Sequence, residues 1–163
     1  MRLVARMALI ALVIGTATST VATGRVSVSL LASTTVCWSL VPVIQLFTGL
    51  LLVRGSSLPQ ARALDLYFGT HRPWSLWLLG FALLILVLPN PGGWVLTLAA
   101  TAVVPIALTA RRLTSLCRLE LGFSAASARR RALLHQAVTG ACCLAYGEYA
   151  GRLLPRFIAD LVR

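Results

Sequence analysis

The sequence predicts an all-α membrane protein with about five transmembrane helices and one short interfacial amphipathic helix. Of its 163 residues, 58% are hydrophobic and only 12% are charged, and the mean hydropathy is +0.87. That balance is too apolar for the surface of a soluble domain. The apolar residues gather in runs close to the roughly 17–25 residues that cross a bilayer as a helix. The formal net charge of +11 comes from 15 arginines, whose uneven spacing marks the sides of a membrane.

We expect the whole chain, residues 1–163, to form one membrane domain with five spans. Their approximate bounds are 3–21, 26–53, 74–88, 94–110 and 132–154. The third and fourth spans are joined by a Pro-Asn-Pro-Gly-Gly run that cannot continue a helix, so they should form an antiparallel hairpin. The first span also fits a secretory signal peptide, because Arg2 and Arg6 precede an apolar stretch and small residues. Cleavage would then follow Ala22.

A short helix is expected just before the third span. Ser57 is placed as its N-cap, Gln60 follows three residues later, and Gly69 is a natural C-terminal stop. Its apolar face would consist of Leu58, Ala61, Leu64 and Phe68. A short amphipathic helix between two spans is typical of a segment that lies on the membrane surface.

The arginines predict the orientation of the spans. Before the fifth span, eleven arginines fall in alternate loops on one side and only Arg25 falls on the other: Arg2, Arg6, Arg54, Arg62, Arg72, Arg111, Arg112, Arg118, Arg129, Arg130 and Arg131. Because arginine-rich loops stay cytoplasmic, the N-terminus should be inside and the C-terminus outside. The tail opposes this rule, since Arg152, Arg156 and Arg163 would lie outside. Pairing of Glu148 with Arg152, or a bend at Pro155, would reduce the conflict.

Two further patterns predict partners. Five arginines that flank the second cytoplasmic loop should bind anionic lipid headgroups: Arg111, Arg112, Arg129, Arg130 and Arg131. On the fifth span, Gly140, Gly147 and Gly151 form a stripe of small residues, and the last two have the GxxxG spacing of closely packed membrane helices. We therefore expect a homo-oligomer or a subunit of a membrane complex. Nucleic acid is not expected, because the positive charge is explained by topology.

The second span carries a polar face. Thr34, Trp38, Gln45 and Thr48 recur at helical spacing. Such a face either lines a path for a solute or holds helices together through hydrogen bonds between them. We favour the packing role.

Asp65, His71 and His135 are the candidate reactive residues, because the topology places all three on the cytoplasmic side at similar depth. An Asp and two His could bind a divalent metal, with Cys117 as a fourth ligand, or relay protons, and the histidines alone could ligate haem. The simpler interpretation is that Asp65 and His71 bond to each other or to the backbone, while His135 reaches toward the interface. We favour it, and therefore expect no metal and no cofactor.

The motifs of several enzyme classes are absent from the sequence. It has no G-x-S-x-G, no H-E-x-x-H, no P-loop and no dinucleotide fingerprint. Its four acids leave little room for a carboxylate-held magnesium site. The lack of lysine suggests a bacterial genome rich in GC. The sequence therefore favours a structural or accessory component of a bacterial inner-membrane assembly over an enzyme. The alternative is a membrane carrier or enzyme that uses Asp65, His71 and His135.

Overall fold

The structure is a computed structural model that describes residues 2–88 and 95–161, and all of its regular elements are helical. In chain order they are α1 (Arg2–Thr23), α2 (Val28–Trp38), α3 (Leu40–Val53), α4 (Gln60–Gly69), α5 (Arg72–Val87), α6 (Val95–Ala100), α7 (Val103–Ser115), the π-helical turn η2 (Leu116–Glu120) and α8 (Ala125–Leu161). The all-helical prediction is confirmed. The predicted turn at 89–93 lies outside the described residues.

Three helical runs are long and apolar enough to cross a membrane: Leu3–Thr23, Val28–Val53 and Gln60–Val87. The first two match the first two predicted spans. The third begins well before residue 74, because α4 and α5 follow each other with only a short break. The predicted fourth and fifth spans are not among these runs. Both α6 and α7 are short, since the helix is interrupted near Pro105, and α8 carries several charged and polar side chains.

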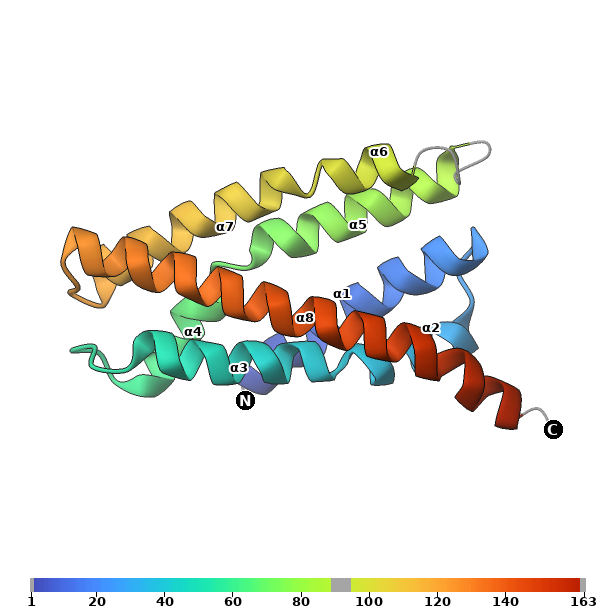
Figure 1. The fold of residues 1–163 in the computed structure, drawn as a ribbon, viewed down its shortest axis with the longest axis horizontal. Coiled ribbons are helices and arrows are strands. Elements are labelled where there is room, and N and C mark those ends of the chain that lie inside the picture. Colours follow the sequence, from blue (N-terminus) through green and yellow to red (C-terminus); the bar gives the residue numbers. More distant parts are fainter. Residues whose placement is uncertain (1, 89–94, 162–163) are drawn as a thin grey trace.

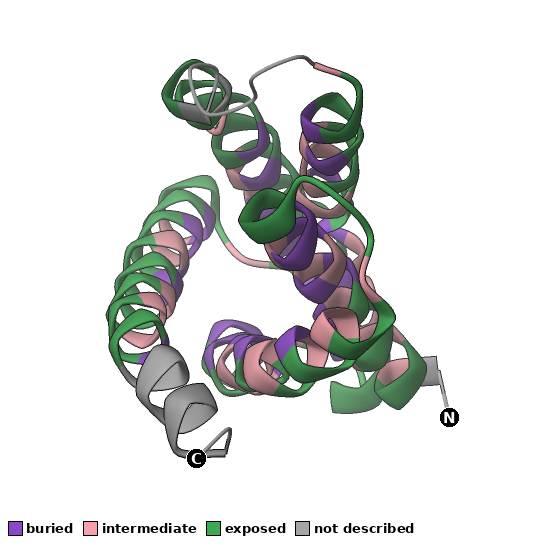
Figure 2. Cartoon of the chain, turned by 90° about the vertical axis from the view of Figure 1, so that its right-hand side faces the viewer, coloured by how far each residue is buried: buried purple, intermediate pink, exposed green. Residues whose placement is uncertain are grey.

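The helices form a bundle in which α8 runs along most of the molecule (Figure 1). It packs against α3 on one side and α7 on the other, while α1 packs against α2 and α5. Figure 2 shows the buried residues on the faces that helices turn toward one another. Pro155 does not end α8, which continues to Leu161.

The main hydrophobic cluster is called here the α4 core. It lies where α4 and the end of α3 meet the end of α7, η2 and the start of α8. Its buried members are Leu52, Val53, Ala63, Leu64, Tyr67, Phe68, Leu113, Leu116, Cys117, Leu121, Ala128 and Ala132. Side chains from five elements therefore meet around α4 and exclude water there.

The surroundings of α4 differ from those predicted. Of the predicted apolar face, Leu64 and Phe68 are buried against other helices in the α4 core, whereas Ala61 is exposed. The helix ends at Gly69 as predicted, but it begins after Pro59, and Ser57 lies outside it. An amphipathic pattern shows that one face is covered without identifying what covers it.

Close helix approach occurs at glycines other than those predicted. A Cβ atom on Gly49 of α3 would lie 2.6 Å from the Tyr67 ring, and one on Gly15 of α1 would lie 2.8 Å from Cα of Thr35. On α8, a Cβ on Gly147 would only touch Trp38 at 3.5 Å. A Cβ on Gly140 or Gly151 would meet no atom of the described residues within 4 Å. Within the described chain, Gly140 and Gly151 therefore make no close approach, and their role in contacts between chains stays a prediction.

Candidate functional site: a buried histidine pair

Two histidines meet inside the bundle with a tyrosine beside them. Tyr67 lies on α4 and His71 lies one helical turn later, at the start of α5, so both fall on the same side. His135 comes from α8. The ring centroids are 4.9 Å apart for Tyr67 and His71, 5.2 Å for Tyr67 and His135, and 5.9 Å for the two histidines. All three side chains are buried. The two predicted histidines therefore converge, although they are far apart in the sequence.

Hydrogen bonds around His135 run in one direction from α4 to α3. The Tyr67 hydroxyl lies 3.2 Å from Nε2 of His135, and the Thr139 hydroxyl lies 3.4 Å from Nδ1. The Thr139 hydroxyl donates to that of Thr48 at 3.0 Å, and the Thr48 hydroxyl donates to the Ile44 carbonyl at 3.0 Å. This order assigns Nδ1 as the protonated nitrogen and Nε2 as the acceptor for Tyr67. The network thus holds a neutral imidazole.

His71 is held by the end of α4. Its Nδ1 lies 3.3 Å from the Tyr67 carbonyl and 3.3 Å from the Thr70 hydroxyl. The Thr70 hydroxyl itself donates to the Tyr67 carbonyl at 2.7 Å. Carbonyls in the last turn of a helix lack partners within that helix. The backbone N–H of Thr70 also bonds the Tyr67 carbonyl, at 2.9 Å, so the side chains of His71 and Thr70 reinforce the end of α4, which is a structural role.

Asp65 lies apart from the histidine pair. Its Oδ1 is 3.3 Å from Nε of Arg6 on α1, and Arg6 also donates to the Asp65 backbone carbonyl. Two residues along a helix are separated by roughly 200° of rotation, so Asp65 and Tyr67 point to different sides of α4. The structure therefore brings together two of the three candidate residues and gives the third to an ion pair between α1 and α4.

Cys117 is part of the α4 core and is fully buried. Burial raises the pKa of its thiol to about 11, although the positive charge of Arg131 acts in the opposite direction. The sulfur is therefore a neutral thiol near pH 7. Among the residues that the structure describes, no three His, Cys, Asp or Glu side chains lie close enough to share a metal ion.

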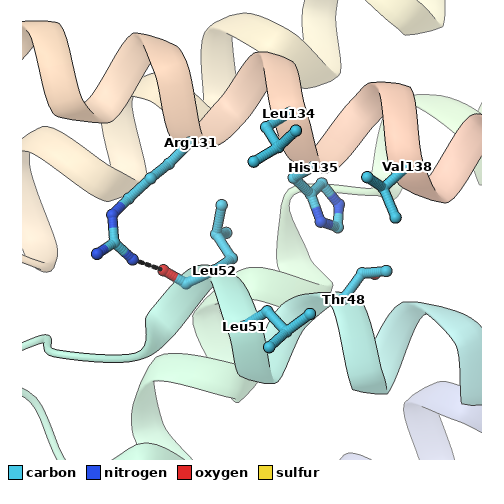
Figure 3. A pocket seen from close by; sticks show the side chains of 7 residues that line it. All are labelled: Thr48, Leu51, Leu52, Arg131, Leu134, His135 and Val138. Carbon is cyan, nitrogen blue, oxygen red and sulfur yellow. Dashed lines mark hydrogen bonds between the residues drawn. The ribbon is translucent and has the colours of Figure 1, made fainter.

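A groove between α3 and α8 reaches the histidine network from the surface. It encloses about 120 Å³ and is lined by Thr48, Leu51, Leu52, Arg131, Leu134, His135 and Val138 (Figure 3). His135 and Thr48 form its polar wall, Arg131 adds one charged side chain, and four aliphatic side chains form the rest. We call it the α3–α8 groove.

Arg131, one of the predicted lipid anchors, also makes contacts within the bundle. Its Nη1 donates to the Leu52 carbonyl at 2.8 Å and to the Arg54 carbonyl at 3.0 Å, and its guanidinium lies 4.0 Å from the centroid of the Phe123 ring. These bonds satisfy carbonyls at the end of α3, where such groups need an outside donor. The other four predicted anchors are exposed: Arg111, Arg112, Arg129 and Arg130.

The candidate residues predicted from the sequence did not include Tyr67 or Thr139, although a signal for each was present. Tyr67 precedes His71 by four residues and Thr139 follows His135 by four, so each shares a helix side with its histidine.

The polar face of the second predicted span holds helices together as expected: Thr48 bonds to Thr139, and Thr34 donates to the Gly15 carbonyl at 2.9 Å. Comparison of the chain with known protein families, curated proteins and solved structures gives no match.

Proposed function

We propose that the chain is a small multi-pass protein of a bacterial inner membrane, where it serves as a structural or accessory component of an assembly. The observation that carries this proposal is the closed network around His135. Each of its donors has an acceptor within the protein, and the last acceptor is the Ile44 backbone carbonyl. Such a network holds α4, α8 and α3 together without needing a substrate.

A membrane location is supported by three helical runs of sufficient length and apolarity. Large aliphatic side chains are also exposed on several helices, among them Leu9, Leu76, Leu83, Val103 and Leu144. A soluble monomer rarely exposes so much apolar surface. Lipid, a second copy or other subunits would cover it.

For the topology we propose five spans, with the N-terminus cytoplasmic and the C-terminus external. The α6–α7 segment lies along α5 (Figure 1), as a fourth span would. The central part of α8 lies along α3, as a fifth span would. The arginine distribution supports the same orientation.

Membrane extraction followed by identification of partners tests this function. The full chain should stay in the membrane pellet at alkaline pH. In mild detergent it should migrate above the size of one copy, either alone or with other proteins. Release into the soluble fraction would contradict the membrane location, and a single copy without partners would contradict the accessory role. A reporter fused after Arg163 should be external, and a cytoplasmic reporter would contradict five spans.

A second candidate function is a membrane carrier or enzyme that uses His71 and His135. The α3–α8 groove favours it, because this opening reaches His135 from the surface. Asp65 would not take part, since it is paired with Arg6. The variants His71→Ala and His135→Ala separate the two candidates in a strain that lacks the natural protein. If both variants accumulate and restore the phenotype, the second candidate is wrong. If they accumulate and assemble but fail to restore it, the accessory role is wrong.

A further inference from the structure

The α3–α8 groove has its one charged group at one end. Along α8 the lining residues follow the order Arg131, Leu134 with His135, and then Val138. On α3, which runs antiparallel beside it, Leu52 lies near Arg131 and Thr48 lies near Thr139. The groove therefore runs from a cationic end toward an apolar end. In the proposed topology this direction leads from the cytoplasmic interface into the bilayer.

Arg131 retains hydrogen-bonding capacity at the mouth of the groove. Both of its bonds to the α3 carbonyls come from Nη1. A guanidinium has five N–H donors, so Nε and Nη2 add three more that can reach an anion. Arg129 and Arg130 precede it on the same helix and are exposed, but they do not line the groove, so Arg131 is its one charged side chain.

The polar groups on the inner wall of the groove already have hydrogen-bond partners within the protein, so they do not require a polar ligand. The Thr48 hydroxyl is used by Ile44 and Thr139, and the His135 nitrogens are used by Tyr67 and Thr139. The remaining lining is aliphatic. A volume of about 120 Å³ is well below the roughly 300–1,000 Å³ of pockets for drug-sized ligands. It suits a narrow apolar chain.

We propose that the α3–α8 groove binds one anionic phospholipid of the cytoplasmic leaflet. The phosphate contacts Arg131, and one acyl chain lies between Leu134 and Val138 of α8 and Leu51 of α3. Basic sites between membrane helices on the cytoplasmic side are suited to such headgroups. This inference rests on the proposed membrane location and adds a specific lipid to it.

Lipid binding to the purified full chain tests the proposal. The probe is dioleoyl-phosphatidylglycerol, and dioleoyl-phosphatidylcholine, with the same acyl chains, is the uncharged control. Native mass spectrometry in detergent should show one phosphatidylglycerol retained about tenfold more strongly than phosphatidylcholine, as expected for one charge-assisted contact. Equal retention of the two lipids would overturn the proposal. Tighter binding of oleate than of phosphatidylglycerol would also overturn it, because the ligand would then be a free fatty acid.

Two pairs of variants locate the site. Leu134→Trp fills the groove and leaves the Arg131 bonds in place, while Leu133→Trp changes an equally exposed neighbour that does not line the groove. Arg131→Gln removes the charge at the mouth, and Arg130→Gln removes an exposed charge outside it. Leu134→Trp and Arg131→Gln should each lower phosphatidylglycerol retention about tenfold relative to their controls. If Leu134→Trp binds as Leu133→Trp does, the proposal is wrong.

The same protein separates this proposal from the broader one. If the wild-type chain leaves the membrane at alkaline pH, the proposed membrane location fails. If it stays in the membrane and the groove variants bind lipid as the wild type does, only the lipid site fails.

Discussion

The α4 core and the outer part of the bundle use similar apolar residues in opposite ways. In the α4 core, Tyr67, Leu113 and Cys117 are completely inaccessible to solvent. Farther along the helices, Leu96 and Leu144 are 83% and 78% exposed. The core is stabilised by contacts within the chain, whereas these outer leucines are left largely uncovered by it. Composition is therefore a poor guide to where this protein is stable.

Truncation of a core leucine should have the largest effect. Leu113→Ala should lower the free energy of unfolding by about 2–5 kcal/mol, because it leaves a cavity in a fully enclosed site. Leu144→Ala, the control on the outer helices, should change it by less than about 0.5 kcal/mol. Unfolding in detergent, followed by circular dichroism, measures both. Equal losses in the two variants would show that the bundle is uniformly packed.

Replacing glycine by alanine should change the free energy of unfolding with opposite sign in the two regions. Gly49→Ala places a methyl group 2.6 Å from the Tyr67 ring, and such overpacking should cost about 1–3 kcal/mol. Gly140→Ala meets no atom of the described residues within 4 Å, so it should gain up to about 1 kcal/mol from helix propensity. The same unfolding measurement applies. A stabilising Gly49→Ala would contradict the close approach of α3 and α4.

Loss of one hydroxyl tests the network around His135. Tyr67→Phe removes the donor to Nε2 and leaves a buried nitrogen without its partner, at a cost of about 1–2 kcal/mol. Tyr149→Phe is the matched control, because Tyr149 is exposed and should tolerate the change. The double variant Tyr67→Phe with His135→Leu should lose less than the sum of the single variants. Additive losses would contradict direct coupling.

The smallest effect should come from the exposed ion pair on α8. Glu148 and Arg152 are one turn apart and mostly exposed, so Glu148→Gln should change the free energy of unfolding by less than about 0.5 kcal/mol. Asp65→Asn, which breaks the less exposed pair with Arg6, should cost more. Added salt should weaken the Glu148 pair first. A larger loss from Glu148→Gln than from Asp65→Asn would reverse the comparison.

Sequence patterns predicted the helices better than their surroundings. One span was predicted at residues 26–53, and the structure has the helical run Val28–Val53, so the predicted start is two residues early. A long apolar segment has few other interpretations. The amphipathic α4 was also recognised as a helix. The helices that cover its apolar face were not predicted, since the sequence pattern is the same whether lipid or α8 covers that face.

The sequence predicted that three candidate residues converge, and the structure brings together two of them. Loop topology placed Asp65, His71 and His135 at one level of the bundle, and only the histidines meet there. The partner of Asp65 is Arg6, which is 59 residues earlier in the chain. Such long-range pairs depend on how helices are rotated against each other, and helical periodicity within a segment does not specify that rotation.

The bonds between α3 and α8 impose an order on biogenesis. The Thr48–Thr139 bond joins residues 91 positions apart, and the Arg131 bond to the Leu52 carbonyl spans 79. At translation rates of about 5–20 residues per second, about 5–20 s pass between the synthesis of α3 and the synthesis of its partner residues on α8. During that interval the Thr48 hydroxyl lacks its partner on α8. A nascent chain halted before Ala125 therefore lacks both of these bonds between α3 and α8.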